Sequence, residues 1–188
     1  MWSFETDPDY QADLDWADDF VRQEIEPLQF VISNMLDTSD PIRQELVPPL
    51  QAKVRERGLW ATHLGPELGG QGHGQVKLAL LNEILGRVPM SSIIFGCQAP
   101  DTGNAEILAH YGTDEHKKKY LQPLLNGEIF STYSMTEPQG GSDPKEFTCQ
   151  ADLDGDEWVI NGEKWFSSNA PWATFLLTMV ITEPDNPP

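Results

Sequence analysis

The stretch "STYSMTEPQGGSD", residues 131–143, determines how the rest of the chain is interpreted. A strand-like alternation runs directly into a threonine, a glutamate and a proline, and paired glycines follow. A hairpin needs fewer special residues than this, because Asn-Gly or Asp-Gly is sufficient. Gly140 and Gly141 let backbone amides approach a ligand closely, and Ser142 offers a hydroxyl beside them. The stretch favours the edge of a binding site, and an ordinary Thr-Glu-Pro turn is the alternative.

The residues before this stretch have a helical pattern. A first helix is predicted from apolar residues that are three or four apart and so share one face: Leu14, Ala17, Val21, Ile25 and Leu28. Asp9 or Asp13 suits its N-terminal turn, and Pro27 is expected to kink or end it. A second helix is predicted over residues 45–57, with Gly58 closing it.

Further helices are predicted after a glycine-rich segment. The segment "LGPELGGQGHG", residues 64–74, is expected to be an irregular connection, since it lacks the Gly-Lys-Ser/Thr ending of a phosphate-binding loop. Three apolar groups then predict helices: Leu78, Leu81, Ile84 and Leu85, ended by Gly86; Ile107, Leu108 and Tyr111, stopped by Gly112; and Tyr120, Leu121, Leu124 and Leu125, with Thr113 or Asp114 as the cap. Lys117-Lys118-Lys119 is the one dense basic cluster, and we expect a solvated helix face.

After Gly127 the period changes to two. Strands are predicted in the segments 129–136, 146–153, 157–168 and 174–182. Turn residues are Asp154-Gly155-Asp156, Asn161-Gly162 and Ala170-Pro171, and Asn161-Gly162 is a two-residue hairpin signal. The predicted class is therefore α+β, with an all-α domain over residues 1–128 and an antiparallel β domain over 129–188. So few strands do not close a sandwich or barrel, so we expect the β domain to be incomplete at Pro188.

The composition excludes several classes of function. Twelve Lys and Arg against 30 Asp and Glu give a net charge of −18, which disfavours nucleic acid and anionic membrane surfaces. The acidic N-terminus is not a targeting segment and no apolar run reaches membrane-spanning length, so a soluble, cytoplasmic protein is expected. Cys97 and Cys149 do not form a disulfide framework and have no basic neighbours to activate a thiol. The four scattered histidines give a metal site little support.

A second stretch, "NGEKWFSSNA" at residues 161–170, also places aromatic and hydroxyl side chains at the end of a strand. A flat, heteroatom-rich ring suits such a wall, because aromatic rings stack on it while hydroxyls and amides bond its edge. Together with "YSMTEPQGGSD", this stretch resembles the paired flavin-wall motifs of the acyl-CoA dehydrogenase family. The segments "GLWATHLGPELGGQGHG", "LLNEILGR" and "HYGTDEHKKKYLQPLLNGE" follow the helical domain of that family in order and spacing. The Ser-Ser pair and "APDTGNAE" favour the branch of human members ten and eleven and actinobacterial homologues.

The resemblance implies FAD as cofactor and assigns residues to it by position. Tyr133, Met135 and Thr136 are expected to contact the isoalloxazine ring, and Ser142 the acyl-CoA, with Gly140 and Gly141 shaping the turn. Two positions depart from the family pattern: Phe166 stands where a tryptophan is usual, and Ser168 where a threonine is usual. The cofactor-binding set is Tyr133, Met135, Thr136, Gly141, Ser142, Phe166, Ser167 and Ser168.

The resemblance also implies α,β-dehydrogenation of an acyl-CoA thioester, with a carboxylate as base. That glutamate belongs to a C-terminal helical domain, which this chain lacks, so we expect no catalytic residue here and assign Glu137 to the wall. The implied partners are an acyl-CoA, electron-transfer flavoprotein or a similar acceptor, and further copies in a homodimer or homotetramer. If the protein is eukaryotic and processed, the mitochondrial matrix replaces the cytoplasm. A non-catalytic remnant or scaffold subunit of a hetero-oligomer, and an acyl-CoA oxidase or flavin monooxygenase of the same fold, remain alternatives.

Overall fold

A computed structural model describes residues 5–68 and 70–184 of the chain. It divides into two compact units, Met1–Ile129 and Phe130–Pro188, here called the helical unit and the β unit. The ends of the chain and Gly69, on which parts of the terminal and loop predictions rest, lie outside the described residues. A helical part followed by a short β region agrees with the predicted α+β class.

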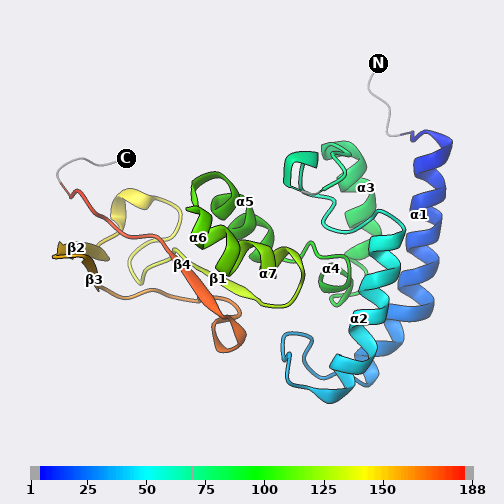
Figure 1. The fold of residues 1–188 in the computed structure, drawn as a ribbon, viewed down its shortest axis with the longest axis horizontal. Coiled ribbons are helices and arrows are strands. Elements are labelled where there is room, and N and C mark those ends of the chain that lie inside the picture. Colours follow the sequence, from blue (N-terminus) through cyan, green and yellow to red (C-terminus); the bar gives the residue numbers. More distant parts are fainter. Residues whose placement is uncertain (1–4, 69, 185–188) are drawn as a thin grey trace. The chain divides into compact units, whose positions relative to one another are not determined.

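The described residues of the helical unit form seven α-helices, labelled in Figure 1. They are α1 (Pro8–Phe20), α2 (Pro41–Glu56), α3 (Gln75–Leu85), α4 (Ser91–Ile94), α5 (Asp101–Tyr111), α6 (Asp114–His116) and α7 (Gln122–Leu125). A five-residue π-helical turn, Lys117–Leu121, joins α6 to α7. Among the described residues, no helix has the length and apolar character needed to cross a membrane.

The first helix has the buried face that its spacing predicts. All five predicted apolar residues are buried, in one core with Phe20, Phe95 and residues of α2 and α3. Asp9 lies in the first turn, as predicted, and Asp7 is the N-cap, because its carboxylate accepts a hydrogen bond from the Tyr10 amide. After Phe20 the helical path continues through a π turn and a 3₁₀ turn, and Pro27 lies in the first turn of the latter.

One prediction about the other helices was wrong in detail. Helix α2 begins at Pro41, four residues before the predicted start, because Asp40 caps it and proline suits a first turn. Helix α5 ends at Tyr111, before Gly112, as predicted; it buries Leu108 with Asn104 and Ala105, whereas Tyr111 is 85% exposed. Thr113 caps α6, as predicted, by accepting a hydrogen bond from the His116 amide.

In the β unit, residues 130–184 form four short strands in two pairs (Figure 1). Strands β2 (Gln150–Asp154) and β3 (Glu157–Asn161) are antiparallel, as predicted. Strands β1 (Ser131–Ser134) and β4 (Phe175–Thr178) pair in parallel, which corrects the prediction of a purely antiparallel domain. A parallel pair needs a long crossover, and the β2–β3 hairpin lies within the one that joins β1 to β4.

The hairpin turn falls within the predicted turn Asp154-Gly155-Asp156, and not at the hairpin signal Asn161-Gly162. Gly155 has φ +64° and connects β2 directly to β3, as a tight hairpin requires. Gly162 ends β3 and lies against Cys149: a Cβ placed on Gly162 would be 2.7 Å from the Cys149 sulfur. The glycine that indicated a turn therefore serves close packing of two segments.

Candidate functional site

The β unit holds the two stretches singled out in the sequence side by side. The Trp165 amide donates a hydrogen bond to the Thr136 carbonyl oxygen at 2.8 Å. Further along, the Thr132 hydroxyl donates to the Ser168 carbonyl oxygen at 2.9 Å. The hydroxyls of Ser134 and Ser167 are 2.8 Å apart. Strand β1 and the segment after β3 are thus joined along their length, although more than twenty residues separate them in sequence.

The turn after β1 is closed by its own backbone. The Glu137 amide donates to the Gly140 carbonyl oxygen at 2.9 Å, and the Gly140 amide donates back to the Glu137 carbonyl oxygen at 3.1 Å. A Cβ on Gly141 would be 3.1 Å from a carbon of the Thr136 side chain, and a Cβ on Gly140 would collide with the Glu146 carboxylate. The backbone of the turn thus lies close to the Thr136 and Glu146 side chains at these two glycines.

Glu137 is the buried hub of this arrangement, at 2% exposure. Its carboxylate accepts five hydrogen bonds: two from the Thr148 amide and hydroxyl, and one each from the Cys149 amide, the Gln139 side chain and the Lys164 ammonium. Burial by itself raises the pKa of this carboxylate, but the hydrogen bonds, led by that from Lys164, outweigh it and lower the pKa to about 2. Glu137 is thus ionised at neutral pH and serves as a structural group.

Lys164 ties this hub to the second stretch. Its ammonium group lies 2.8 Å from the Glu137 carboxylate and donates to the Met135 carbonyl oxygen, also at 2.8 Å. The ammonium also lies 4.6 Å from the centroid of the Phe147 ring. Sequence reasoning missed this residue. The available signal was the single cation in the segment "WVINGEKWF", which has aromatic and β-branched residues at both ends.

The segment after Lys164 has an unusual backbone. Phe166, Ser167 and Asn169 have backbone φ values of +71°, +38° and +70°. These lie in the left-handed region, which residues other than glycine rarely adopt. Such conformations cost about 1–3 kcal/mol each and concentrate at ligand sites. This backbone leaves the Phe166 ring 82% exposed. The buried side-chain amide nitrogen of Asn169 has no hydrogen-bond partner among the described residues, so it is an unused donor at this place.

The predicted site residues differ in exposure. Tyr133 is 37% exposed and alternates with the buried Thr132 and Ser134, so its ring lies on the other face of β1. Met135, Thr136 and Ser167 are half-buried, and Gly141, Ser142, Phe166 and Ser168 are exposed. All of them belong to the β unit. The structure joins Thr136 to the Trp165–Ser168 segment directly, whereas no described hydrogen bond links Ser142 to that segment.

Other chemically capable side chains form no second centre among the residues that the structure describes. Burial raises the pKa of the Cys97 thiol to about 12, which opposes a nucleophilic role. Cys149 is buried beside Gly162, and both cysteines are free. No cluster of three or more metal-ligating side chains occurs in the described part of the chain.

Comparison with protein families assigns nearly all of the chain. Residues 7–128 match the N-terminal domain of acyl-CoA dehydrogenases, and residues 132–187 match the middle domain. The chain belongs to the acyl-CoA dehydrogenase family.

Relatives confirm the predicted branch. Human acyl-CoA dehydrogenase family member 11 is 38% identical over 173 residues, which cover 89% of this chain and 22% of the human protein. The probable acyl-CoA dehydrogenase FadE2 of Mycobacterium tuberculosis is 39% identical over 79% of this chain and 36% of its own length. This chain thus spans about a fifth to a third of these relatives.

Solved structures agree with the fold. A putative acyl-CoA dehydrogenase from Mycobacterium abscessus superposes with a TM-score of 0.81 at 34% identity, over 97% of this chain and 48% of that one. A glutaryl-CoA dehydrogenase from Mycobacterium smegmatis, solved in complex with FADH2, has a TM-score of 0.69 over 95% of this chain and 44% of its own. At 22% identity the second likeness concerns the fold alone.

Proposed function

We propose that this chain forms the flavin wall and part of the acyl-CoA site of an FAD-dependent enzyme that dehydrogenates an acyl-CoA thioester between its α and β carbons. The observation that carries this proposal is the pairing of the two stretches through Thr136 and Trp165. That pairing places Phe166 in the open and beside the end of β1, where a flat ring can stack on it. Family membership supports the same assignment.

The residues present fit a flavin. The unpartnered Asn169 amide and the Ser168 hydroxyl offer polar contacts, and the strained backbone holds them beside the exposed Phe166 ring. Tyr133, Met135, Thr136 and Ser167 complete the cofactor side, while Gly141 and Ser142 shape the turn toward the acyl-CoA. When bound, FAD supplies the two-electron acceptor for the β-hydrogen of the thioester. This chain's residues position the ring and exclude water from one side of it.

The catalytic base is proposed to come from outside this chain. Glu137 is a carboxylate of the wall motif itself, but its oxygens accept five hydrogen bonds and its pKa is about 2. A base for an α-carbon proton needs a higher proton affinity and a free oxygen. The chain alone is therefore expected to be inactive. It is also expected to bind FAD weakly. Electron-transfer flavoprotein as acceptor, a homo-oligomeric enzyme and a cytoplasmic location are parts of this proposal.

Flavin absorbance and fluorescence during titration of the purified chain with FAD test the wall. Weak binding is expected, weakened further by Phe166→Ala and strengthened by Phe166→Trp, which restores the larger ring. Phe30→Ala, an equally exposed phenylalanine of the helical unit at 84%, is the matched control and should change nothing. Equal effects of the two alanine variants contradict the wall assignment.

Assay with an acyl-CoA, FAD and an artificial electron acceptor tests the missing base. The chain alone is expected to form no enoyl-CoA. Turnover by the chain alone contradicts the assignment of the base to another domain or chain. Hydrogen peroxide formed under air by the complete enzyme would identify an oxidase instead of a dehydrogenase.

A further inference from the structure

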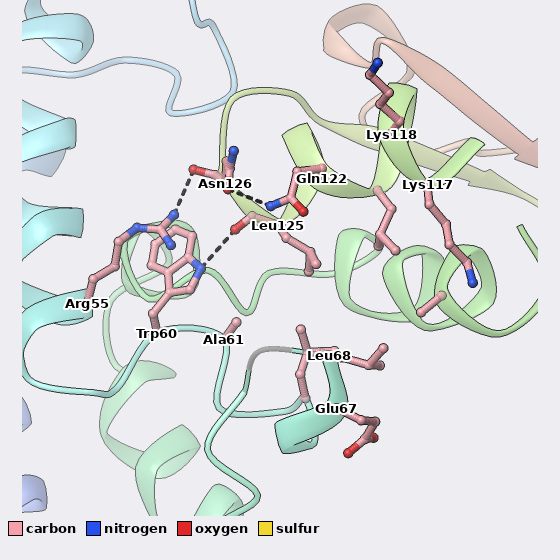
Figure 2. Close-up of a pocket in the computed structure, with 13 residues that line it drawn as sticks. Arg55, Trp60, Ala61, Glu67, Leu68, Lys117, Lys118, Gln122, Leu125 and Asn126 are labelled. Carbon is pink, nitrogen blue, oxygen red and sulfur yellow. Dashed lines mark hydrogen bonds between the residues drawn. The ribbon is translucent and has the colours of Figure 1, made fainter. Parts of the chain in front are cut away.

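The helical unit contains a cavity that the flavin wall does not use. It has a volume of about 740 Å³ and lies between the loop after α2 and helices α5 to α7 (Figure 2). This volume is within the range of small-molecule sites, roughly 300–1,000 Å³. Its lining includes six aliphatic side chains: Ala61, Leu64, Leu68, Ala109, Leu121 and Leu125.

One end of the cavity presents an oriented guanidinium group. The guanidinium carbon of Arg55 lies 3.5 Å from the centroid of the Trp60 ring, and the group donates to the Asn126 carbonyl oxygen at 2.8 Å. The Trp60 indole donates to the Leu125 carbonyl oxygen at 3.0 Å, which fixes the ring beneath it. A guanidinium has five N–H donors in a rigid fork, and the described hydrogen bonds use one of them. Arg55 is thus held in place with donors to spare.

The opposite end presents a lysine from the basic triplet. Lys117 and Lys118 both line the cavity, whereas Lys119 does not, and its ammonium lies 5.0 Å from the Tyr120 ring centroid. In Figure 2, Lys117 extends on the side opposite Arg55, whereas the Lys118 ammonium points away from Leu68. Glu67 is the acidic member of the lining. Lys118 and Lys119 are exposed, in agreement with the predicted solvated helix face, whereas Lys117 is half-buried beside the cavity.

We propose that this cavity binds an aliphatic dicarboxylate, with one carboxylate on Arg55, the other on Lys117 and the hydrocarbon chain against the leucines. Two cations at opposite ends of an apolar cavity match two acid groups joined by an apolar spacer. The site is notable in a chain of net charge −18, which repels anions elsewhere. It lies wholly within the helical unit and does not depend on the flavin wall.

Isothermal titration of the whole chain with suberate and with octanoate tests the proposal, since the two have the same chain length and differ by one carboxylate. Suberate is expected to bind roughly tenfold more tightly, because octanoate leaves one cation without a partner. Octylammonium, with the opposite charge, and inorganic phosphate, without an apolar chain, are expected not to bind. Equal affinity for suberate and octanoate, or no binding of suberate, overturns the proposal.

Charge reversals within the triplet sharpen the test. Lys117→Glu should remove the preference for suberate, while Lys119→Glu, the same change two residues away, should keep it. Amide exchange rates of both variants, matching those of the unmodified chain, establish that each is folded. An equal loss of affinity in both variants would show a general charge effect and refute a built site. Arg55→Gln should weaken both ligands, and unchanged affinity for suberate in that variant also refutes the site.

Discussion

The helical unit encloses a core of apolar side chains, whereas the centre of the β unit is an ion pair, Glu137 with Lys164. In the helical unit Ile25, Val54, Leu81 and Phe95 are each fully buried or nearly so, and they belong to one continuous cluster. In the β unit the described buried apolar residues are few: Phe130, Phe147, Cys149 and Ala151. The β unit instead buries hydroxyls and a carboxylate, with hydrogen bonds that connect its two long segments.

This difference teaches how each unit tolerates change. Apolar packing is non-directional, so the loss of one side chain leaves a cavity whose cost depends on its size. A buried ion pair is directional, so the loss of one partner leaves an uncompensated charge and several unsatisfied amides. Removal of Glu137 should therefore destabilise the β unit more than removal of any single surface side chain destabilises the helical unit.

Glu137→Ala is the substitution expected to have the largest effect. It leaves the Lys164 ammonium, at 9% exposure, without its carboxylate, and frees the Thr148 and Cys149 amides. The β unit should lose about 3–5 kcal/mol of stability, measured from amide hydrogen exchange of β1 and β4. Glu163→Ala, in an exposed residue that accepts one bond from the Trp165 indole, is the control. Similar small losses in both variants would show that the ion pair is not the centre of the unit.

Phe95→Ala should have the next largest effect, confined to the helical unit. The Phe95 ring is fully buried and packs edge-on against Trp16 and Phe20. A cost of about 3–4 kcal/mol is expected in amide exchange of α1 and α3. Phe30→Ala, at an exposed position, should cost almost nothing. If β1 and β4 lose as much protection as α1, the two units do not respond separately.

The two units are expected to lose stability over different pH ranges as the solution is acidified. Burial lowers the pKa of His63 from 6.5 to about 4, so the unfolded chain takes up this proton first and the helical unit loses stability as pH falls from 6.5 to 4. The pKa of Glu137 is lowered from 4.5 to about 2, so its contribution is complete above pH 4.5 and is lost as pH falls toward 2.

Two substitutions check this order by amide exchange as a function of pH. His63→Gln should flatten the slope of the helical unit between pH 6.5 and 4 and leave the β unit unchanged. Glu137→Gln should flatten the slope of the β unit between pH 4.5 and 2. An unchanged slope in either variant means that other groups dominate the acid response of that unit.

An exposed ion pair should give the smallest effect. Arg22 and Asp18 are 2.9 Å apart, a distance similar to that between Lys164 and Glu137, but the Arg22 side chain is 62% exposed. Arg22→Gln should lower the free energy of unfolding by about 0.3–0.5 kcal/mol, because water screens the exposed pair. The loss should be smaller in high salt, since dissolved ions screen the pair further. A loss comparable to that of Glu137→Ala in thermal unfolding would show that burial does not set the value of an ion pair here.

The sequence by itself determined the class of fold, the inner face of α1 and the two unusual stretches that the structure joins through Thr136 and Trp165. These depend on local spacing: a period near 3.6 fixes which residues share a helix face, and Gly140-Gly141 marks a tight approach whatever surrounds it. The family followed from the order of such stretches along the chain, and the family comparison confirms it.

The tertiary structure alone decided the parallel pairing of β1 with β4, the packing role of Gly162, the burial of Lys164 under Glu137 and the cavity beside Lys117. Each is a relation between residues far apart in the chain, and the local pattern of either partner is the same whether or not they meet. On α5 the apolar spacing predicts the helix, and only the packing decides that Leu108 is buried and Tyr111 exposed. Periodicity fixes which residues lie on the same side of an element, and only packing decides what that side contacts.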